Sequence, residues 1–380
     1  MIKIFIVTER RADFSRFDPI IKLIKKDKNL DYQLVVTGIH LMKEYGYTID
    51  EIKKKKYKIY DQFKIFDKKY LEINDGAEMS NSLGKAVSKL SKILTKAKPD
   101  LILSGFDIAA NLAVTICGAH MNIPVAHIQG GEVSGTIDES IRHAMTKFSN
   151  FHFTANNDSK RRLIKMGEVP KNIFAVGCPS IDALKNEKDL ENSKVLKKFN
   201  IDMKKKYMLV IQHPVTSELN KSSNQFIETI SSVKKTNLQH LIIFPNNDAG
   251  AFKIVKFLKK SKLNYAQSLD LREYKTLLKH CSVLVGNSSS GIHEAASFTI
   301  PVVNIGTRQQ GRFKSKNVIT TPYSRKKIYL AIKKAMSDNF NNKIKGIINP
   351  YGDGKSAKRI VSIIKRFDLK NFNTQKQITY

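Results

Sequence analysis

The chain has 380 residues, of which 41% are hydrophobic, and a formal net charge of +32, so it is long enough for two ordinary globular domains. No apolar stretch approaches the roughly 18 residues of a membrane span, and charged residues follow the first apolar run, Ile2–Val7, too soon for a secretion signal. The cysteines Cys117, Cys178 and Cys281 show neither metal-ligand spacing nor a pairing pattern, which predicts a reducing cytoplasm and no structural metal.

The positive charge comes from lysine rather than arginine. Lys outnumbers Arg 54 to 12 and is scattered through nearly every segment, with the densest runs at Lys53–Lys56 and Lys204–Lys206. Nucleic-acid sites tend to cluster Arg and to interleave aromatic residues. We therefore expect no nucleic-acid partner and no membrane partner, although the positive field would attract an anionic small molecule.

The first half of the chain alternates short apolar runs with amphipathic segments, which predicts an α/β fold with parallel strands. Strands are expected at Ile2–Thr8, Gln33–Thr37, Leu101–Leu103, Val125–Ile128, Phe151–Thr154 and Ile173–Val176. Helices are expected to include Asp18–Lys26, to run from a Ser80 cap to about Lys96, and to cover Ile108–Met121 and Ile137–Lys147.

The second half repeats this type of architecture without repeating the sequence. The polar stretch Lys185–Lys206 predicts a domain junction. Strands are expected at Tyr207–Gln212, Leu241–Phe244, Val283–Val285 and Val302–Asn304, and a final amphipathic helix from about Lys355 to Arg366. The predicted division is an N-terminal domain over residues 1–184, a C-terminal domain over 185–354 and a closing helical segment over 355–380.

An anion site is predicted where the strand Val283–Val285 ends. Gly286 is followed by Asn287, by three serines and by Gly291, and a helix is expected to open at Ile292. Backbone N–H groups at a helix start and the positive end of its dipole suit a phosphate or diphosphate. The serine hydroxyls add donors, and Glu294 lies about one turn further on, where a carboxylate can accept bonds from a ribose. A simple serine cap is the alternative.

A second polar cluster follows the strand Val125–Ile128. The paired glycines of Gln129–Glu132 allow close approach of a ligand, and open α/β sheets bind ligands where their strands end. Charged and titratable side chains then gather within a dozen residues: Glu132, Asp138, Glu139, Arg142 and His143. Asp138 and Arg142 are spaced to share one face of a helix, and the alternative is a solvated helix start.

These motifs, with others in the same order along nearly the whole chain, resemble the UDP-N-acetylglucosamine 2-epimerases, specifically the hydrolysing branch of sialic and related nonulosonic acid pathways. The matching segments are Thr8–Phe14, Ile123–His143, Gly177–Asp182, His213–Thr216, Phe244–Asp248, Gly286–Glu294 and Asn304–Arg312. The resemblance implies a GT-B fold, in which two Rossmann-like domains hold the sugar nucleotide in the cleft between them and the final helix packs back on the first domain.

The resemblance also implies roles for individual residues. Those expected to act as acid/base groups are Asp107, Glu132 and Asp138, with His213 as a further catalytic candidate. Those expected to contact substrate or nucleotide are Arg11, Asp13, Arg142, His143, Asn246, Asp248, Asn287, Ser288, Ser289, Ser290, Gly291, Glu294, Arg308 and Arg312. No metal or cofactor is implied, and a homo-oligomer, dimer or tetramer, is expected.

One departure concerns Asp107. The family usually has Gly-Asp-Arg or Gly-Asp-Thr after the fourth strand, whereas this chain reads Ser104-Gly105-Phe106-Asp107. The register from Asp107 to Pro124 fits the family aspartate, but Phe106 separates it from its glycine. The sequence alone leaves open whether Asp107 still faces the site and which sugar nucleotide is used.

Four other functions stay open at this stage. A GT-B glycosyltransferase would share the nucleotide half but would not need three carboxylates near the sugar. A non-hydrolysing epimerase would return a nucleotide-linked product, and residues 130–143 favour the hydrolysing branch over it. A non-catalytic sensor is disfavoured by Glu132, Asp138 and His213, and a nucleic-acid binder by the scattered charge.

Overall fold

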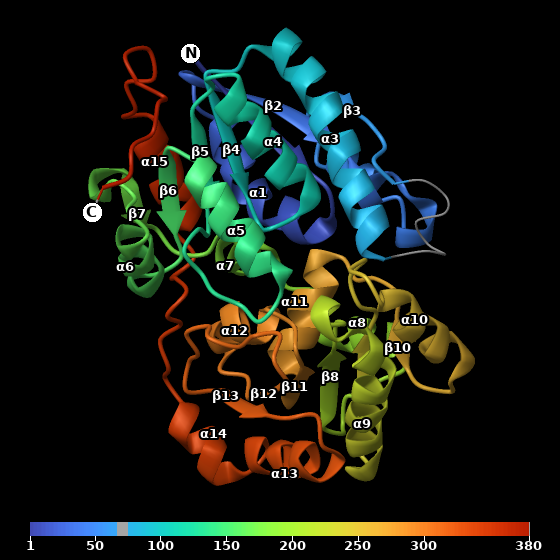
Figure 1. Ribbon diagram of the computed structural model, residues 1–380. Helices are drawn as coiled ribbons and strands as arrows, with labels where there is room; N and C mark the ends of the chain where they lie inside the picture. Colours follow the sequence, from blue (N-terminus) through green and yellow to red (C-terminus); the bar gives the residue numbers. More distant parts are fainter. Residues whose placement is uncertain (67–74, 380) are drawn as a thin grey trace. The chain divides into compact units, whose positions relative to one another are not determined.

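The computed structural model describes residues 1–66 and 75–379, which form two compact units. The first unit comprises residues 1–132, 138–185 and 351–380, and the second comprises 133–137 and 186–350. Each unit is built on one parallel β-sheet with helices between successive strands (Figure 1). The α/β class predicted from the sequence is confirmed.

The first sheet has seven parallel strands, and β1 (Ile2–Thr8) lies in its interior. From one edge to the other the strands are β3 (Ile59–Gln62), β2 (Leu30–Val36), β1, β4 (Leu101–Gly105), β5 (Val125–Ile128), β6 (Phe151–Thr154) and β7 (Ile173–Ala175). The helices are α1 (Arg11–Ile24), α2 (Ile49–Lys54), α3 (Gly76–Ala97), α4 (Ala109–His120), α5 (Ile137–Phe148), α6 (Asn157–Lys165), α7 (Pro179–Asn186) and α15 (Ser356–Ile364).

Both faces of this sheet are covered, so its strands are apolar throughout. Along β1, Ile4 and Ile6 pack in one core with α1 and α15, whereas Phe5 and Val7 pack in the other with α3 and α4. This alternation follows from the two-residue period of a strand, and burial on both faces is typical of parallel sheets.

The second sheet has six parallel strands in the order β10 (Tyr265–Ala266), β9 (Gln239–Ile243), β8 (Tyr207–Ile211), β11 (Val283–Gly286), β12 (Val302–Ile305) and β13 (Val318–Thr321). Its helices are α8 (Asn192–Lys198), α9 (Ser222–Lys235), α10 (Ala251–Lys260), α11 (Leu271–His280), α12 (Ser290–His293), α13 (Arg325–Ala335) and α14 (Asp338–Ile344). One core contains α8 and α11, and the other contains α9, α10 and α13.

Three local predictions can be compared with the structure. The helix expected to start at a Ser80 cap is α3, which starts at Gly76 because the Asp75 carboxylate accepts hydrogen bonds from the N–H groups of Ala77 and Glu78. The stretch expected as a junction, Lys185–Lys206, starts where the first unit ends and the second begins, between Lys185 and Asn186, and it also contains α8. The chain joins the first unit again at Tyr351, before the predicted position 355, and the buried Tyr351 accepts a hydrogen bond from the Cys178 N–H at 2.6 Å.

Candidate active site

Arg142 on α5 is the centre of the polar cluster in the first unit. Its side chain is 1% exposed, and its guanidinium donates to Asp107 Oδ2 at 2.5 Å and to the carbonyl of Glu132 at 2.8 Å. Burial lowers the pKa of Arg142, but the negative charges of Asp107, Glu132 and Asp138 outweigh burial and raise it. The buried cation therefore pairs directly with the Asp107 carboxylate, contacts Glu132 through its backbone carbonyl, and lies one helical turn after Asp138 on α5.

Asp107 lies in this cluster because the residue before it, Phe106, packs its ring into the hydrophobic core. Phe106 is buried, and its ring packs edge-on against Phe17 with centroids 4.9 Å apart. The backbone is left-handed at both Phe106 (φ 75°) and Asp107 (φ 53°), a conformation that is strained for a bulky residue. The strained turn allows the ring to point into the core while Asp107 contacts Arg142.

Glu132 ends a tight loop that starts at Gln129. Gln129 has a φ of 62° and donates from its side-chain amide to Glu132 Oε1 at 2.8 Å. Gly131 has a φ of 78°, and a Cβ there would lie 2.5 Å from the carbonyl oxygen of Ser159, so only glycine fits. Sequence reasoning missed Gln129, although its place between a strand and a glycine pair was a usable signal.

His143 and Asp138 lie on the same helix as Arg142. His143 Nε2 is 3.8 Å from Glu139 Oε1. Burial, together with the charge of Arg142, lowers the pKa of His143, so its imidazole is neutral at pH 7. Asp138 lies in the first turn of α5, where a carboxylate is favoured by the helix dipole.

Arg11 and Asp13, both predicted ligand contacts, have protein partners. Asp13 is buried and accepts hydrogen bonds from the N–H groups of Glu9 and Arg10 at 2.9 and 2.8 Å, so it caps the start of α1. Arg11 forms an ion pair with Glu51, and its Nε donates at 2.9 Å. Asp13, the third residue of α1, therefore has a structural role at the start of the helix.

In the second unit the serine loop follows β11, as predicted, but the expected helix is short. The helix expected to open at Ile292 is α12, which starts at Ser290 and ends at His293, where a 3₁₀ turn takes over. A helix of one turn has a small dipole, so the loop must rely on its N–H and hydroxyl donors. Gly291 lies inside this turn.

The serines are not equivalent. Ser290 Oγ donates to Glu294 Oε2 at 2.6 Å and contacts the Tyr274 hydroxyl, while Ser288 Oγ accepts from the Ser290 N–H at 3.3 Å. Ser290, Glu294 and Tyr274 therefore form one side-chain cluster. Sequence reasoning missed Tyr274, because it lies on α11, outside the motif.

Asn287 joins the loops that follow three neighbouring strands. It is fully buried, donates to the carbonyl of His213 at 2.8 Å and accepts from the His213 N–H at 2.7 Å. His213 Nδ1 in turn accepts from the backbone N–H of Asn246 at 3.0 Å. Because this bond requires Nδ1 to be unprotonated, the neutral ring carries its proton on Nε2 and presents a donor there.

The remaining predicted contacts of this unit also have protein partners. Asn246 donates to Asp248 Oδ2 at 2.5 Å, and Arg308 lies 3.7 Å from the same carboxylate and donates to the carbonyl of Asn287 at 3.3 Å. Arg312 donates to the carbonyl of Val133 at 3.0 Å, and its Nη1 lies 3.0 Å from His293 Nε2. Both arginines fix loops within the second unit.

Comparison with known proteins identifies the family. A family model for UDP-N-acetylglucosamine 2-epimerase matches residues 22–365. A protein from Legionella pneumophila named UDP-N,N'-diacetylbacillosamine 2-epimerase (hydrolyzing) is 35% identical over 97% of this chain and 96% of its own length. A UDP-N-acetylglucosamine 2-epimerase from Neisseria meningitidis is 32% identical over 99% and 98%. The chain belongs to the UDP-N-acetylglucosamine 2-epimerase family.

The fold agrees with the family. The crystal structure of a Neisseria meningitidis UDP-GlcNAc 2-epimerase bound to UDP-GlcNAc superposes with a TM-score of 0.82 at 19% identity, covering 96% of this chain and 100% of that one. The segment Gly177–Asp182 has a structural role in this chain. The Asp182 carboxylate accepts from the N–H groups of Ser356 and Ala357 at 3.0 and 2.8 Å and so caps α15.

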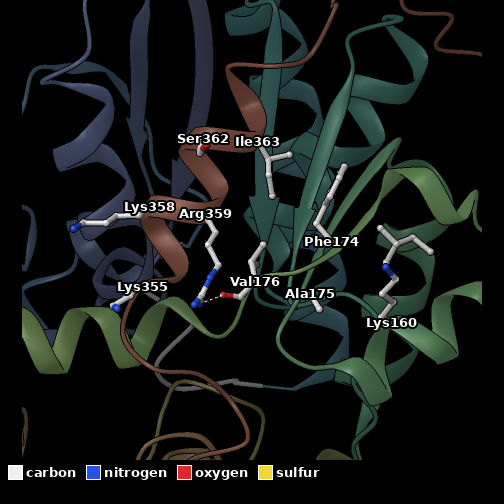
Figure 2. A pocket seen from close by; sticks show the side chains of 10 residues that line it. Lys160, Phe174, Ala175, Val176, Lys355, Lys358, Arg359, Ser362 and Ile363 are labelled. Carbon is white, nitrogen blue, oxygen red and sulfur yellow. Dashed lines mark hydrogen bonds between the residues drawn. The ribbon is translucent and has the colours of Figure 1, made fainter.

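A cavity of about 610 Å³ lies elsewhere in the first unit, beside the edge strand β7 and α15 (Figure 2). Lys160, Lys355, Lys358 and Arg359 surround an apolar floor, and Arg359 donates to the carbonyl of Val176 at 3.1 Å. None of the residues predicted to act on substrate lines this cavity, so it is separate from the carboxylate cluster.

The cysteines of this family member are free and buried: Cys117, Cys178 and Cys281. Burial raises the pKa of the thiols to about 11, 11 and 12, so they are not thiolates at neutral pH.

Within residues 1–66 and 75–379, no group of three or more His, Cys, Asp or Glu side chains is placed to hold a metal ion. No helix in the described part of the chain is long and apolar enough to cross a membrane.

Proposed function

We propose that the chain is a hydrolysing sugar-nucleotide 2-epimerase, which converts UDP-N-acetylglucosamine, or a related UDP- or GDP-linked 2-acetamido sugar, to the nucleoside diphosphate and the free sugar with inverted C2. The observation that carries this proposal is the buried Arg142, which pairs with the Asp107 carboxylate and binds the backbone carbonyl of Glu132, on the helix that also carries Asp138. The name of the Legionella relative, which includes the hydrolysing activity, supports the same branch.

The chemistry explains why several carboxylates are needed. In the first step a base removes the C2 proton, the C2–H electron pair forms the C1=C2 bond, and the C1–O bond breaks as UDP leaves. Because C2 is not adjacent to a carbonyl, its proton is weakly acidic. Cleavage of the C1–O bond must therefore be more advanced than removal of the proton in the transition state, which leaves positive charge on the ring. Carboxylates near C1 and C2 stabilise such a transition state. Asp107, Glu132 and Asp138 are the groups we assign to this task.

The second step adds water to the glycal. The water oxygen bonds to C1, its proton goes to a carboxylate, and a carboxylic acid returns a proton to C2 from the opposite face. One carboxylate can remove the C2 proton from one face of the ring, and a different carboxylic acid can return a proton from the opposite face. Because Arg142 offsets the charge of the three carboxylates, they can lie close together without mutual repulsion dominating.

The leaving diphosphate requires donors, which we assign to the second unit. His213 presents an Nε2–H donor, and the hydroxyls and N–H groups of Ser288 and Ser289 follow the end of β11. Glu294 is assigned to the ribose. Donors placed where the charge develops lower the barrier most.

The test is incubation in deuterated water with UDP-N-acetylglucosamine, UDP-N,N'-diacetylbacillosamine and the GDP-linked diacetamido sugar, followed by mass spectrometry and NMR. The proposal expects UDP or GDP together with a free sugar that carries deuterium at an inverted C2. A product that stays linked to the nucleotide would show a non-hydrolysing epimerase, and transfer to an added acceptor would show a glycosyltransferase.

The substrate, the assembly and the compartment are part of the same proposal. The sugar nucleotide is the proposed partner, and the protein is proposed to act as a homo-oligomer in the cytoplasm. Light scattering of the purified protein tests the oligomer, which a monomer mass at working concentration would contradict.

A further inference from the structure

The C-terminal tail, residues 371–379, returns to the end of α5. Lys376 Nζ donates to the carbonyls of Thr146 at 2.7 Å, Lys147 at 3.2 Å and Ser149 at 2.8 Å. These carbonyls belong to the last turn of α5 and the residue just after it, where acceptors lack partners within the helix and the dipole is negative. Lys376 thus caps the helix that carries Arg142 and Asp138.

The tail is fastened on both sides of Lys376. Before it, the Asn150 side chain donates to the carbonyl of Thr374 at 3.1 Å, and Phe372 packs on Phe151 with ring centroids 4.6 Å apart. After it, the Thr379 N–H donates to the carbonyl of Gly167 at 3.0 Å. In Figure 1 this red segment ends beside α6. The position of Lys376 is therefore fixed by backbone contacts as well as by its charge.

Lys376 also neutralises a buried carboxylate. It forms an ion pair with Glu168, whose side chain is 0% exposed and which also contacts His152 Nε2 at 3.0 Å and Lys147 Nζ at 3.1 Å. Burial raises the pKa of Glu168, but His152 and Lys376 outweigh burial and lower it to about 2. The carboxylate is therefore ionised at neutral pH, and removal of Lys376 would leave a buried charge with less compensation.

A short path of contacts links this cap to the carboxylate cluster. Thr146 Oγ1 donates to the carbonyl of Arg142 at 3.0 Å and lies 3.3 Å from His127 Nδ1. Arg142 is one helical turn before Thr146, and its guanidinium binds Asp107. Because α5 is only three turns long, displacement of its last turn displaces Arg142 as well.

We propose that Lys376 is a positioning residue, through which the C-terminal tail holds α5 so that Arg142 aligns the three carboxylates for catalysis. This inference rests on the proposed function for its effect on turnover. Its effect on α5 does not depend on the reaction. Lys376 is not expected to touch the substrate, so its loss should lower kcat and leave KM nearly unchanged.

The experiment compares Lys376→Met with Lys376→Arg and with the control Lys365→Met. Lys365 pairs with Asp27 at 2.7 Å, so the control also removes one C-terminal lysine ion pair, but away from α5. We expect Lys376→Met to lower kcat about 10-fold, since small misplacements of reacting groups cost rate, with KM within about 2-fold. Lys376→Arg should keep most of the activity, and the control should match the unchanged protein.

Hydrogen exchange measured by mass spectrometry supplies a readout that needs no turnover. Amides of residues 137–148 should exchange about 10-fold faster in Lys376→Met than in Lys365→Met. If Lys376→Met does not fold, Lys376→Gln, which keeps hydrogen-bond donors but lacks the charge, replaces it with the same expected kcat loss. A wild-type kcat together with a lower melting temperature, or unchanged exchange in α5, would overturn the proposal. If no sugar nucleotide is turned over by the unchanged protein, the proposed function fails, and the exchange comparison still decides the role of the tail.

Discussion

The candidate regions of the two units differ in the kind of interaction that holds them together. In the first unit, the negative charges of the ionisable groups Asp107, Glu132 and Asp138 raise the pKa of Arg142. In the second unit, Asn287 and His213 join the loops after β8, β9 and β11 through mostly neutral hydrogen bonds. A cluster of charges around a buried cation suits proton transfer, whereas a rigid set of neutral donors suits an anion. The difference predicts that turnover and nucleotide affinity can be lost separately.

The largest expected effect is on turnover, from the carboxylates that the sequence and the structure both single out. Glu132→Gln and Asp138→Asn should each lower kcat about 1,000-fold or more, because each removes a group assigned to proton transfer. Steady-state release of UDP is the measurement. Glu139→Gln, which changes the neighbouring carboxylate on α5, is the control and should stay within about 2-fold. Full activity in both variants would contradict the assignment.

Asp107→Asn should come next, with a loss of kcat of at least about 100-fold, the low end for a general acid/base group. The Arg142 contact at 2.5 Å keeps the carboxylate in the cluster in spite of Phe106. The same release assay applies, with Asp158→Asn as a matched surface control. A nearly silent Asp107→Asn would mean that Asp107 only supports Arg142 and that two carboxylates perform the chemistry.

We expect acid to destabilise the first unit more than the second. The increase in local opening should differ between the two units by roughly tens of fold. In the first unit, burial lowers the pKa of His40 to about 3 and that of His127 well below its usual value. Because these folded-state pKa values lie below the unfolded value of about 6.5, the unfolded state binds more protons, and stability falls as pH drops below about 6.5.

Hydrogen exchange at pH 7.5 and pH 5, corrected for intrinsic rates, measures this difference. We expect the protection of β1, β2 and β5 to fall more than that of β8 and β11. His240 and His280 of the second unit also have lowered pKa values but are less buried. Equal loss in both units would show that the buried histidines of the first unit do not set its stability.

The smallest effect is expected in the serine loop. Ser288→Ala and Ser289→Ala should each weaken UDP binding by about 1 kcal/mol, roughly 5-fold, and leave the chemical step nearly unaffected. Calorimetric titration with UDP is the measurement, and Ser324→Ala, whose hydroxyl makes no capping bond, is the control. A double variant with unchanged affinity would remove the serines from the nucleotide site.

Among the described strands, the sequence predicted all but β3, β10 and β13, together with the loops at their ends, because the spacing of apolar residues and glycine pairs are local signals. It also placed Asp138 and Arg142 on one helix face. It did not predict that Arg142 would be buried, since burial depends on what packs over that face. The loop contacts of Arg308 and Arg312 depend on partners distant from the motif that suggested ligand binding, whereas Asp13 caps its own helix through Glu9 and Arg10 of the same motif.

The tail illustrates the same limit. Nothing near Lys376 in the sequence marks it, and its partners, Thr146 and Glu168, lie more than 200 residues earlier. The short α12 ends within the motif itself, and a 3₁₀ turn begins at Ala295, two residues after His293. Where a motif is followed by a regular element, the sequence is a good guide, and where distant segments meet, only the structure assigns the contact.

The most direct test of the division between chemistry and binding is to measure both quantities on Glu132→Gln. Turnover is followed by release of UDP, and affinity is measured by calorimetric titration with UDP on the same preparation. We expect turnover to fall about 1,000-fold or more while the Kd for UDP stays within about 2-fold. A Kd that weakens 10-fold or more while turnover is retained would contradict the division.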